Sequence, residues 1–282
     1  EMRHVPIWAV LCHAGGWKDY VPFYKELMPV VEGRPSSMPP EKVKNHLLKA
    51  LLENPPVYKP LKAFQYSDLG YMLAGFIIEE ITGMCLHNFF KELANDFGLT
   101  DELSYFPLSF QQQGYDANVS RRAVSTGWSE WRRRWLKGEV HDENCFAMGG
   151  VAGHAGLFGT ARAVNRLLTK LYLAWRGNGT EIPVTKDVIR HFWERRKEVP
   201  DSTWAIGFDT PSPQGSTAGR FFSQTSVGHL GFTGTSFWLD LNDGFSVVLL
   251  TNRVYYPNTK ERMRRFREEI HDLVRMEYGK AR

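Results

Sequence analysis

The stretch TSFWLDLNDGFSVVLLTNR, residues 235–253, limits the fold more than any other part of the sequence. Two runs of β-branched, aromatic and aliphatic residues flank Asn242-Asp243-Gly244, and Asp-Gly between such runs is typical of a β-hairpin turn. The second run is apolar at successive positions, which predicts a central strand that needs cover on both faces. The rest of the chain must therefore supply layers on both sides of this hairpin.

Helices that could form these layers are predicted by apolar residues spaced three and four apart. One follows Pro39-Pro40, one runs over residues 67–83, and one begins after Thr160. A last helix is predicted within residues 258–278. Its inward-facing residues are expected to be Met263, Phe266, Ile270, Leu273 and Val274.

The 67–83 helix has a second face made of Gly70, Ala74 and Gly75, which allows another segment to pack closely against it. Residues 100–160 show no clear periodicity, and we interpret them as an irregular functional wall.

This order of elements predicts an α+β fold with an antiparallel sheet flanked by helices and an all-helical lobe. We expect a single domain over residues 1–282 with two lobes. One is mostly helical (10–200), and the other contains the C-terminal strands and helix (204–282).

The composition fits a globular protein with a sizeable core, because 43% of the 282 residues are apolar and 23% are charged. A net charge of +4 is too small to indicate a nucleic-acid partner, and no apolar run reaches membrane-spanning length. Cys12, Cys85 and Cys145 are odd in number and lack metal-ligand spacing, so neither disulfides nor a zinc site are predicted. Cys145 is expected to be a buried, inert thiol rather than a nucleophile.

Tyr66, Ser67 and Asp68 stand together where the 67–83 helix begins. Unpaired backbone N–H groups and the helix dipole favour negative charge at such an end. We therefore expect a lowered pKa for Tyr66, which would help its phenol to take a proton from a hydroxyl nucleophile. The alternative is that Ser67 and Asp68 only cap the helix and that Tyr66 only packs.

A second group of residues lies in GHLGFTGTS, residues 228–236. Its three glycines, at the beginning of a predicted strand, allow close approach to the backbone. The N–H of Phe232 could then point at a developing oxyanion, with His229 as a polar group beside it. The alternative is a glycine bulge on an edge strand with a surface histidine.

Together these motifs resemble those of the serine β-lactamase-like hydrolases, which include class C β-lactamases, penicillin-binding DD-peptidases and related esterases. Residues 66–68 resemble the Y-x-N motif of this family, and residues 229–231 resemble its K-T-G strand. Three longer segments agree with the resemblance: AVLCHAGGWKDY, GEVHDENCFAMGGVAGHAGLFGTARAVNRLL and TGTSFWLDLNDGFSVVLLTNR.

The resemblance implies a β-lactamase/transpeptidase-like fold and a bacterial enzyme that forms an acyl-enzyme on an ester or amide, of esterase, DD-peptidase or β-lactamase type. No cofactor is implied. An ionised Asp68, in place of the family's usual Asn, cannot donate a hydrogen bond, and a neutral His229 binds a carboxylate less well than lysine does. The implied catalytic residues are Tyr66, Asp68 and His229, and the implied substrate-binding residues are Ser67, Gly231, Phe232 and Thr233.

The family's nucleophile is a serine three residues before a lysine, but no Ser or Thr in this sequence has Lys at that distance. We therefore expect the nucleophile-bearing segment to be absent from this chain, and the fold to be incomplete at its N-terminus. The expected partners are a small-molecule or peptide substrate and a complementing N-terminal segment or second chain. The competing hypothesis is a catalytically inactive relative that binds a peptide or cell-wall fragment. The compartment, cytoplasmic or exported, is left open.

The histidines outside these motifs are interpreted as structural. His141, Asp142 and Glu143 are adjacent and point in different directions, which favours a hydrogen-bonded loop over a metal site. His13 and His154 are likewise expected to be structural loop residues.

Overall fold

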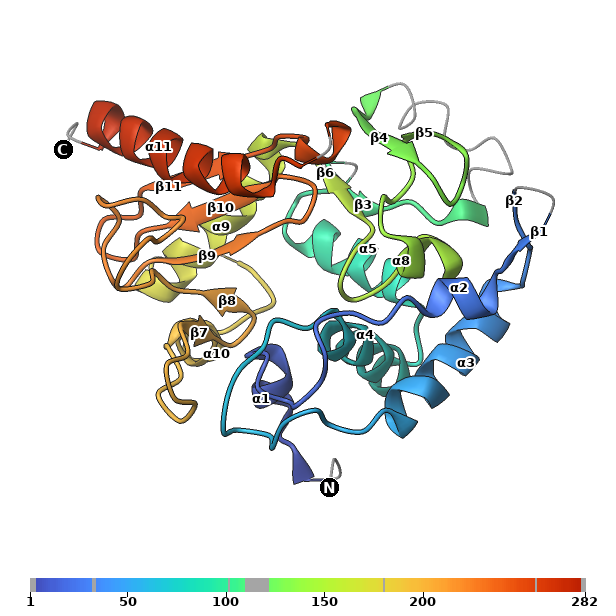
Figure 1. The fold of residues 1–282 in the computed structure, drawn as a ribbon. Coiled ribbons are helices and arrows are strands. Elements are labelled where there is room, and N and C mark those ends of the chain that lie inside the picture. Colours follow the sequence, from blue (N-terminus) through green and yellow to red (C-terminus); the bar gives the residue numbers. More distant parts are fainter. Residues whose placement is uncertain are drawn as a thin grey trace. The chain divides into compact units, whose positions relative to one another are not determined.

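The computed structural model describes residues 4–31, 34–100, 102–109, 122–179, 181–256 and 258–279. The chain forms two compact units, which can be followed in Figure 1. Both contain helices, and every strand pair whose register is described is antiparallel. The predicted α+β class is therefore confirmed. The first unit comprises Glu1–Asn95 and Leu103–Phe158, and the second comprises Asp96–Glu102 and Gly159–Arg282.

The first unit is mainly helical. Its longer helices are α3 (Pro40–Glu53), α4 (Asp68–Thr82) and α5 (Leu86–Asp96), and its shorter ones are α1 (Ile7–Leu11), α2 (Phe23–Leu27) and α8 (Glu143–Ala147). Its small sheets pair β1 (Val30–Val31) with β2 (Arg34–Pro35), β3 (Leu103–Tyr105) with β6 (Leu157–Gly159), and β4 (Ser125–Ser129) with β5 (Arg134–Lys137).

The segment 100–160 is thus more regular than the sequence indicated. It contains β3–β6 and α8, although residues 110–121 lie outside the described part of the chain. None of the described helices is by itself long and apolar enough to cross a membrane. The bent pair α4 and α5, with 79° between them, meets that criterion jointly and only by length and composition.

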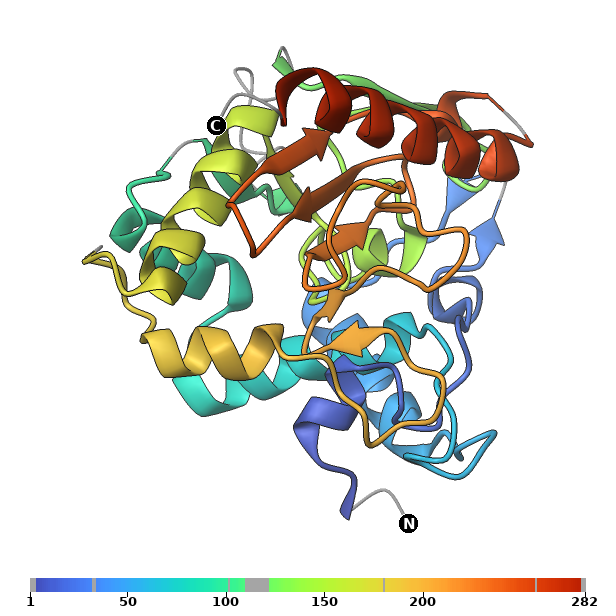
Figure 2. The same cartoon turned by 90° about the vertical axis from the view of Figure 1, so that its left-hand side faces the viewer.

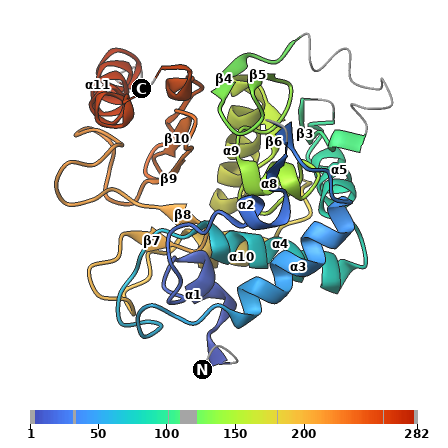
Figure 3. The same ribbon diagram turned by 45° about the vertical axis from the view of Figure 1, so that its right-hand side comes forward.

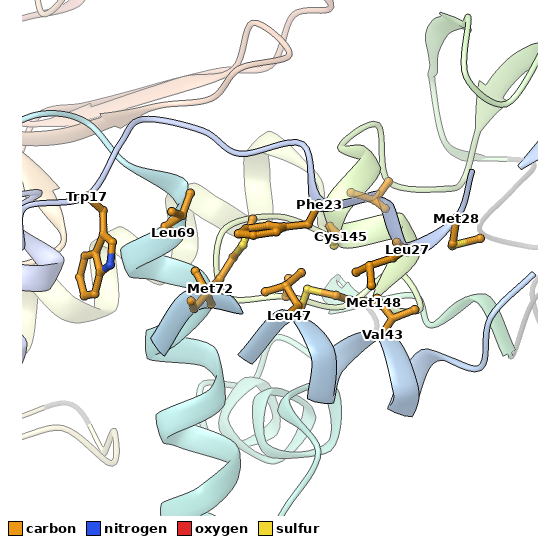
Figure 4. Packing of buried hydrophobic residues seen from close by; sticks show 14 of the residues in the cluster. Trp17, Phe23, Leu27, Met28, Val43, Leu47, Leu69, Met72, Cys145 and Met148 are labelled. Atoms are coloured by element: carbon orange, nitrogen blue, oxygen red, sulfur yellow. The ribbon is translucent and has the colours of Figure 1, made fainter. Parts of the chain in front are cut away.

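The core of the first unit gathers side chains from α2, α3, α4 and α8 (Figure 4). Val43, Leu47 and Leu51 are buried on one face of α3, as their spacing predicted. Cys145 is fully buried among them, and burial raises the pKa of its thiol well above the usual value. A thiol in this state is inert, so the expected structural role of Cys145 is confirmed.

The small face of α4 is packed closely, as predicted. An added Cβ at Gly70 would lie 3.0 Å from Cγ1 of Val10 in α1. At Gly75, it would lie 2.9 Å from the backbone nitrogen of Gly153. The absence of side chains at these positions therefore lets α1 and the loop around Gly153 reach the helix backbone.

Gly153→Ala should destabilise the protein by about 1–3 kcal/mol, the usual penalty for overpacking. The new Cβ would overlap the carbonyl oxygen of Tyr71 in α4, and backbone atoms cannot move aside as a flexible side chain can. The free energy of unfolding in urea measures the effect. Gly179→Ala is the matched control, because nothing lies within 4 Å of a Cβ added there. Equal stability of Gly153→Ala and the wild type would contradict the close packing.

The second unit is built on a five-stranded sheet with the order β11-β10-β9-β8-β7. Figures 2 and 3 show α9 and α11 on opposite sides of this sheet. Phe237 of the sheet packs in the cluster formed with α9 and α10, and the adjacent Trp238 packs against Ala218 and Phe222 on the other face. The hairpin predicted at residues 235–253 is therefore present and covered on both faces. The strands are β7 (Trp204–Ala205), β8 (Phe208–Asp209), β9 (Val227–Leu230), β10 (Ser236–Leu239) and β11 (Ser246–Leu249), and the helices are α9 (Ala161–Arg176), α10 (Lys186–Trp193), the 3₁₀ helix η2 (Arg253–Tyr255) and α11 (Lys260–Tyr278).

The grouping of helices differs from the lobe boundary expected near residue 200. Helices α9 and α10 belong to the second unit, because Leu168 and Trp193 share a buried cluster with Val227 and Leu239 of the sheet. The sequence places these helices among the other helices, but their apolar faces are covered by strands that come later in the chain.

The inner face of α11 is also different from the prediction. Met263 is buried as expected, but Phe266 and Leu273 are 43% and 61% exposed. Arg267 and His271 are buried instead, and both hydrogen-bond to backbone carbonyl groups. The inner face of this helix satisfies the polar groups of turns, so hydrophobic spacing alone gives the wrong orientation.

Candidate active site

The first group of predicted residues lies where α4 begins. The helix starts at Asp68, and Ser67 is its N-cap residue. The Ser67 hydroxyl does not cap the helix but donates to the carbonyl of Lys18 at 2.6 Å, and the N–H of Asp68 donates to the carbonyl of Asp19 at 3.0 Å. The turn at residues 66–68 is therefore fastened to the segment AVLCHAGGWKDY.

His13 of that segment lies against the turn. The residue is 2% exposed and has a positive φ of 57°. Its Nδ1 accepts a hydrogen bond from the N–H of Ser67 at 3.1 Å, so the neutral ring holds its proton on Nε2. The ring centroid lies 4.3 Å from that of Tyr66 and 5.1 Å from that of Tyr71. The structural role expected for His13 is confirmed, and that role is to hold Tyr66 and Ser67.

Tyr66 does not have the lowered pKa that its place before the helix suggested. Burial and the carboxylate of Asp68 both disfavour the phenolate and raise the pKa of Tyr66 above its usual value. The residue precedes the N-cap, and the charge that acts on it is negative. The residue as a whole is 48% exposed, and its phenol is in the neutral form at neutral pH.

Asp68 is a half-buried residue whose carboxyl group has a raised pKa. Burial raises its pKa to about 6, the charge of His154 opposes this shift, and the carboxylates of Asp142 and Asp19 add to it. Below this pH the side chain is a neutral acid that can donate a hydrogen bond, as the amide of an asparagine does. The expected weakness of an Asp at this position therefore depends on pH.

Asp142 and His154 form a partly buried pair whose charges act on Asp68. Nε2 of His154 lies 2.9 Å from Oδ1 of Asp142, and the His154 side chain is 3% exposed. The same Oδ1 caps α8 by accepting the N–H of Cys145 at 2.7 Å. Burial disfavours the Asp142 carboxylate, but these two hydrogen bonds and the charges of His154 and Arg132 together outweigh it and lower the pKa of Asp142. The sequence predicted a hydrogen-bonded loop here but not this pair.

The second group of predicted residues lies at the end of β9 and in the turn that follows. His229 is in β9, and residues 231–233 are in the turn before β10 rather than at the beginning of a strand. Because β9 pairs with both β8 and β10, the alternative of an edge strand is wrong. A Cβ at Gly231 would overlap the hydroxyl of Thr235, which explains the glycine.

The turn is compact and carries an exposed aromatic ring. The N–H of Gly231 donates to the carbonyl of Thr235 at 2.7 Å, and the carbonyl of Thr233 accepts the N–H of Arg253 at 2.7 Å. The Phe232 side chain is 71% exposed, with the Arg253 guanidinium 4.4 Å from its ring centroid. A cation over a ring at this distance is attracted by its π-face.

His229 is positioned as a neutral imidazole. Burial lowers its pKa, and its ring lies 5.5 Å from the ring of Trp204. Nδ1 lies 2.8 Å from the carbonyl oxygen of Leu230. A carbonyl only accepts, so Nδ1 carries the proton and Nε2 of the neutral ring is an acceptor. An acceptor does not pair with a carboxylate, which agrees with the weak carboxylate binding expected for this residue.

The predicted site residues thus form two groups, with Tyr66, Ser67 and Asp68 in the first unit and residues 229–233 in the second. Their catalytic and binding roles stay predictions. No group of three or more His, Cys, Asp or Glu side chains that could hold a metal ion occurs within the described residues.

Comparison with known proteins decides the family. Residues 3–272 match the family model described as Beta-lactamase. The chain belongs to the Beta-lactamase family. The resemblance inferred from the motifs is therefore confirmed over nearly the whole chain, and with it the assignment to β-lactamase-like hydrolases.

Relatives within this family have similar names. A protein of Escherichia coli (strain K12) named "Putative D-alanyl-D-alanine carboxypeptidase" is 32% identical over 226 residues, which cover 76% of this chain and 50% of that protein. A protein of Salmonella gallinarum (strain 287/91 / NCTC 13346) with the same name is 30% identical over 222 residues, covering 76% and 51%. The chain therefore spans about half the length of the curated relatives that it matches.

Solved structures agree on the β-lactamase-like fold. The hydrolase EstCE1, described as having promiscuous acyltransferase activity, superposes with a TM-score of 0.61 at 19% identity, covering 93% of this chain and 71% of its own. A penicillin-binding protein homologue from Caulobacter crescentus gives 0.58 at 18% identity, covering 95% and 71%. At these identities the likeness concerns the fold alone, and it confirms the predicted architecture.

Proposed function

We propose that the full-length protein is a serine acyl hydrolase of the D-alanyl-D-alanine carboxypeptidase or esterase type. Its nucleophilic serine would lie in a part of the full-length protein outside these 282 residues, since no Ser or Thr here precedes Lys by three positions. The serine oxygen attacks the acyl carbonyl carbon, and its proton passes through the Tyr66 hydroxyl to the leaving alcohol or amine. Water then attacks the acyl-serine ester, which releases a carboxylic acid and restores the serine.

The observation that supports this proposal most is the way the turn at residues 66–68 is held. His13 and the carbonyl of Asp19 accept backbone N–H groups of the turn, and the carbonyl of Lys18 accepts the Ser67 hydroxyl, while the residue Tyr66 remains 48% exposed. A partly exposed tyrosine beside a turn whose backbone is fixed suits a proton relay, because proton transfer needs a group held within hydrogen-bond reach of the reacting atoms.

The choice between peptide and ester substrates rests on two different observations. The names of the relatives favour a peptide that ends in D-alanyl-D-alanine. The neutral His229 with its proton on Nδ1 favours an ester, because a substrate carboxylate would meet an acceptor there rather than a cation. We place the carboxypeptidase type first, since its support comes from proteins at least 30% identical to this chain.

Labelling and turnover by the full-length protein test the proposal. We expect covalent labelling by a serine-reactive phosphonate, release of D-alanine from an N-acyl-D-Ala-D-Ala peptide, and hydrolysis of a p-nitrophenyl ester. Faster ester turnover with no D-alanine release would select the esterase type. No labelling and no turnover, together with saturable binding of a cell-wall peptide, would reject the hydrolase and support the inactive binding module.

A further inference from the structure

Arg267, on the inner face of α11, is a buried cation without a carboxylate partner among the described residues. It is 7% exposed, and within the described part of the chain the charge that acts on its pKa is that of another cation, Arg253. Other arginines on the same helix have acidic partners: Arg264 pairs with Glu268 at 3.3 Å, and Arg275 pairs with Asp243 at 2.7 Å. Burial and the charge of Arg253 lower the pKa of Arg267 to about 10, so it stays protonated at neutral pH.

The guanidinium of Arg267 reaches both ends of the turn that follows β9. Its Nη2 donates to the carbonyl of Gly231 at 2.9 Å and to the carbonyl of Thr235 at 2.6 Å. The same two residues close the turn from within, because the N–H of Gly231 donates to the carbonyl of Thr235 at 2.7 Å. One amino group of Arg267 therefore bridges Gly231 and Thr235, and Phe232 and Thr233 lie between these two residues in the turn.

Burial of an unpaired charge destabilises the folded state of a protein. An apolar side chain of similar volume at such a position is often neutral or stabilising, whereas an ion without a counter-ion loses its hydration. The two carbonyl groups recover part of this loss, but Arg253 adds repulsion. Stability alone therefore does not account for the arginine, and its geometric effect on the turn does.

We propose that Arg267 is a positioning residue that fixes the turn at residues 231–235, so that the N–H of Phe232 and the side chain of Thr233 keep one orientation toward the acyl group of the substrate. The role in catalysis rests on the proposed function, but the fixing of the turn does not. The effect reaches the reaction through the backbone of the turn, and Arg267 itself touches no reacting atom.

The conservative variant is informative because of the chemistry of the two side chains. The planar guanidinium places two N–H groups of one amino nitrogen on two carbonyl groups at once. A lysine has the charge and three donors on a flexible chain, so it can restore part of the bridge. A methionine fills similar space but donates to neither carbonyl, and it leaves both without this donor.

The test compares Arg267→Met and Arg267→Lys in the full-length protein. We expect Arg267→Met to lower kcat for the p-nitrophenyl ester by about tenfold with KM changed less than threefold, because a displaced transition-state donor affects kcat more than ground-state binding. Arg267→Lys should recover about half of the loss in kcat on a logarithmic scale, and not all of it, because its flexible chain restores only part of the bridge. Hydrogen exchange at the amides of residues 231–235 should be faster in Arg267→Met. The control is Arg264→Met, which removes another arginine of α11 that bonds the carbonyl of Gly215 at 2.9 Å; its kcat should be unchanged.

The outcomes separate this inference from the proposed function. Wild-type kcat and unchanged exchange in a folded Arg267→Met variant would overturn the inference. If the wild type shows no labelling or turnover, the proposed function fails, and exchange in the turn still decides whether Arg267 fixes it. If Arg267→Met does not fold, Arg267→Lys decides: a lowered kcat with faster exchange confined to residues 231–235 supports the inference, and wild-type behaviour overturns it.

Discussion

Replacement of Tyr66 by phenylalanine should slow acylation of the full-length protein by about 10²- to 10⁴-fold, the usual effect of a lost acid–base group. The substitution removes one hydroxyl and keeps the ring that lies 4.3 Å from the ring of His13, so the turn should keep its structure. The rate of labelling by a serine-reactive phosphonate and kcat/KM for a p-nitrophenyl ester measure the effect.

The control is Tyr24→Phe, which removes a phenol hydroxyl in the same unit. The ring of Tyr24 packs edge-on against that of Trp131, with 4.7 Å between the ring centroids. Tyr24 does not belong to the motif at residues 66–68, so loss of its hydroxyl should leave the acylation rate within about twofold of the wild-type rate. A Tyr66→Phe variant that acylates at the wild-type rate would remove Tyr66 from the mechanism, whatever the fold family implies.

The size of the Tyr66 effect should not change between about pH 5 and pH 9. The pKa of Tyr66 is raised from its ordinary value near 10, because burial and Asp68 disfavour the phenolate. The phenol is therefore neutral over this whole range, and it must pass a proton on while it receives another. This differs from the phenolate base that its position next to a helix suggested.

The sequence predicts the elements of this fold better than it predicts their partners. The face of α3 and the hairpin β10–β11 were predictable, because their burial follows from a local period and a turn signal. The inner face of α11 was not, since Arg267 is buried there by hydrogen bonds to a turn more than thirty residues earlier in the chain. No spacing within the helix carries that information.

The candidate site shows the same division. Tyr66 and His229 could be selected because each stands in a motif of unusual composition. The structural roles of His13 and His154 could be predicted, but their partners Ser67 and Asp142 could not, because the packing of loops on α4 determines them. The protonation states also depend on burial, which is a property of the folded chain. The pKa of Tyr66 was therefore predicted to be lowered, whereas burial raises it.

The ratio of wild-type to Asp68→Asn activity should fall about 50-fold between pH 6 and pH 8. Burial raises the pKa of Asp68 to about 6, so its neutral form, which donates a hydrogen bond, predominates below this pH. Well above pH 6, the fraction of the neutral form falls about tenfold for each pH unit. We propose that residue 68 donates a hydrogen bond to the substrate. Asparagine donates at every pH and would keep this bond, which an ionised aspartate loses. Because both proteins contain the same other titratable groups, the ratio of their kcat/KM values reports mainly on Asp68 and on the groups that its charge influences.

A second control is Asp19→Asn, introduced into both the wild type and Asp68→Asn, with the pH dependence of their activity ratio measured again. The Asp19 carboxylate helps to raise the pKa of Asp68, so its removal should move the midpoint of the ratio to lower pH while the shape of the curve is kept. A ratio that rises with pH would instead mean that the carboxylate form of Asp68 is the active one, acting as an acceptor or a base. A flat ratio would mean that position 68 makes no pH-dependent contact with the substrate, and that its shifted pKa is only a consequence of burial beside Asp142 and His154.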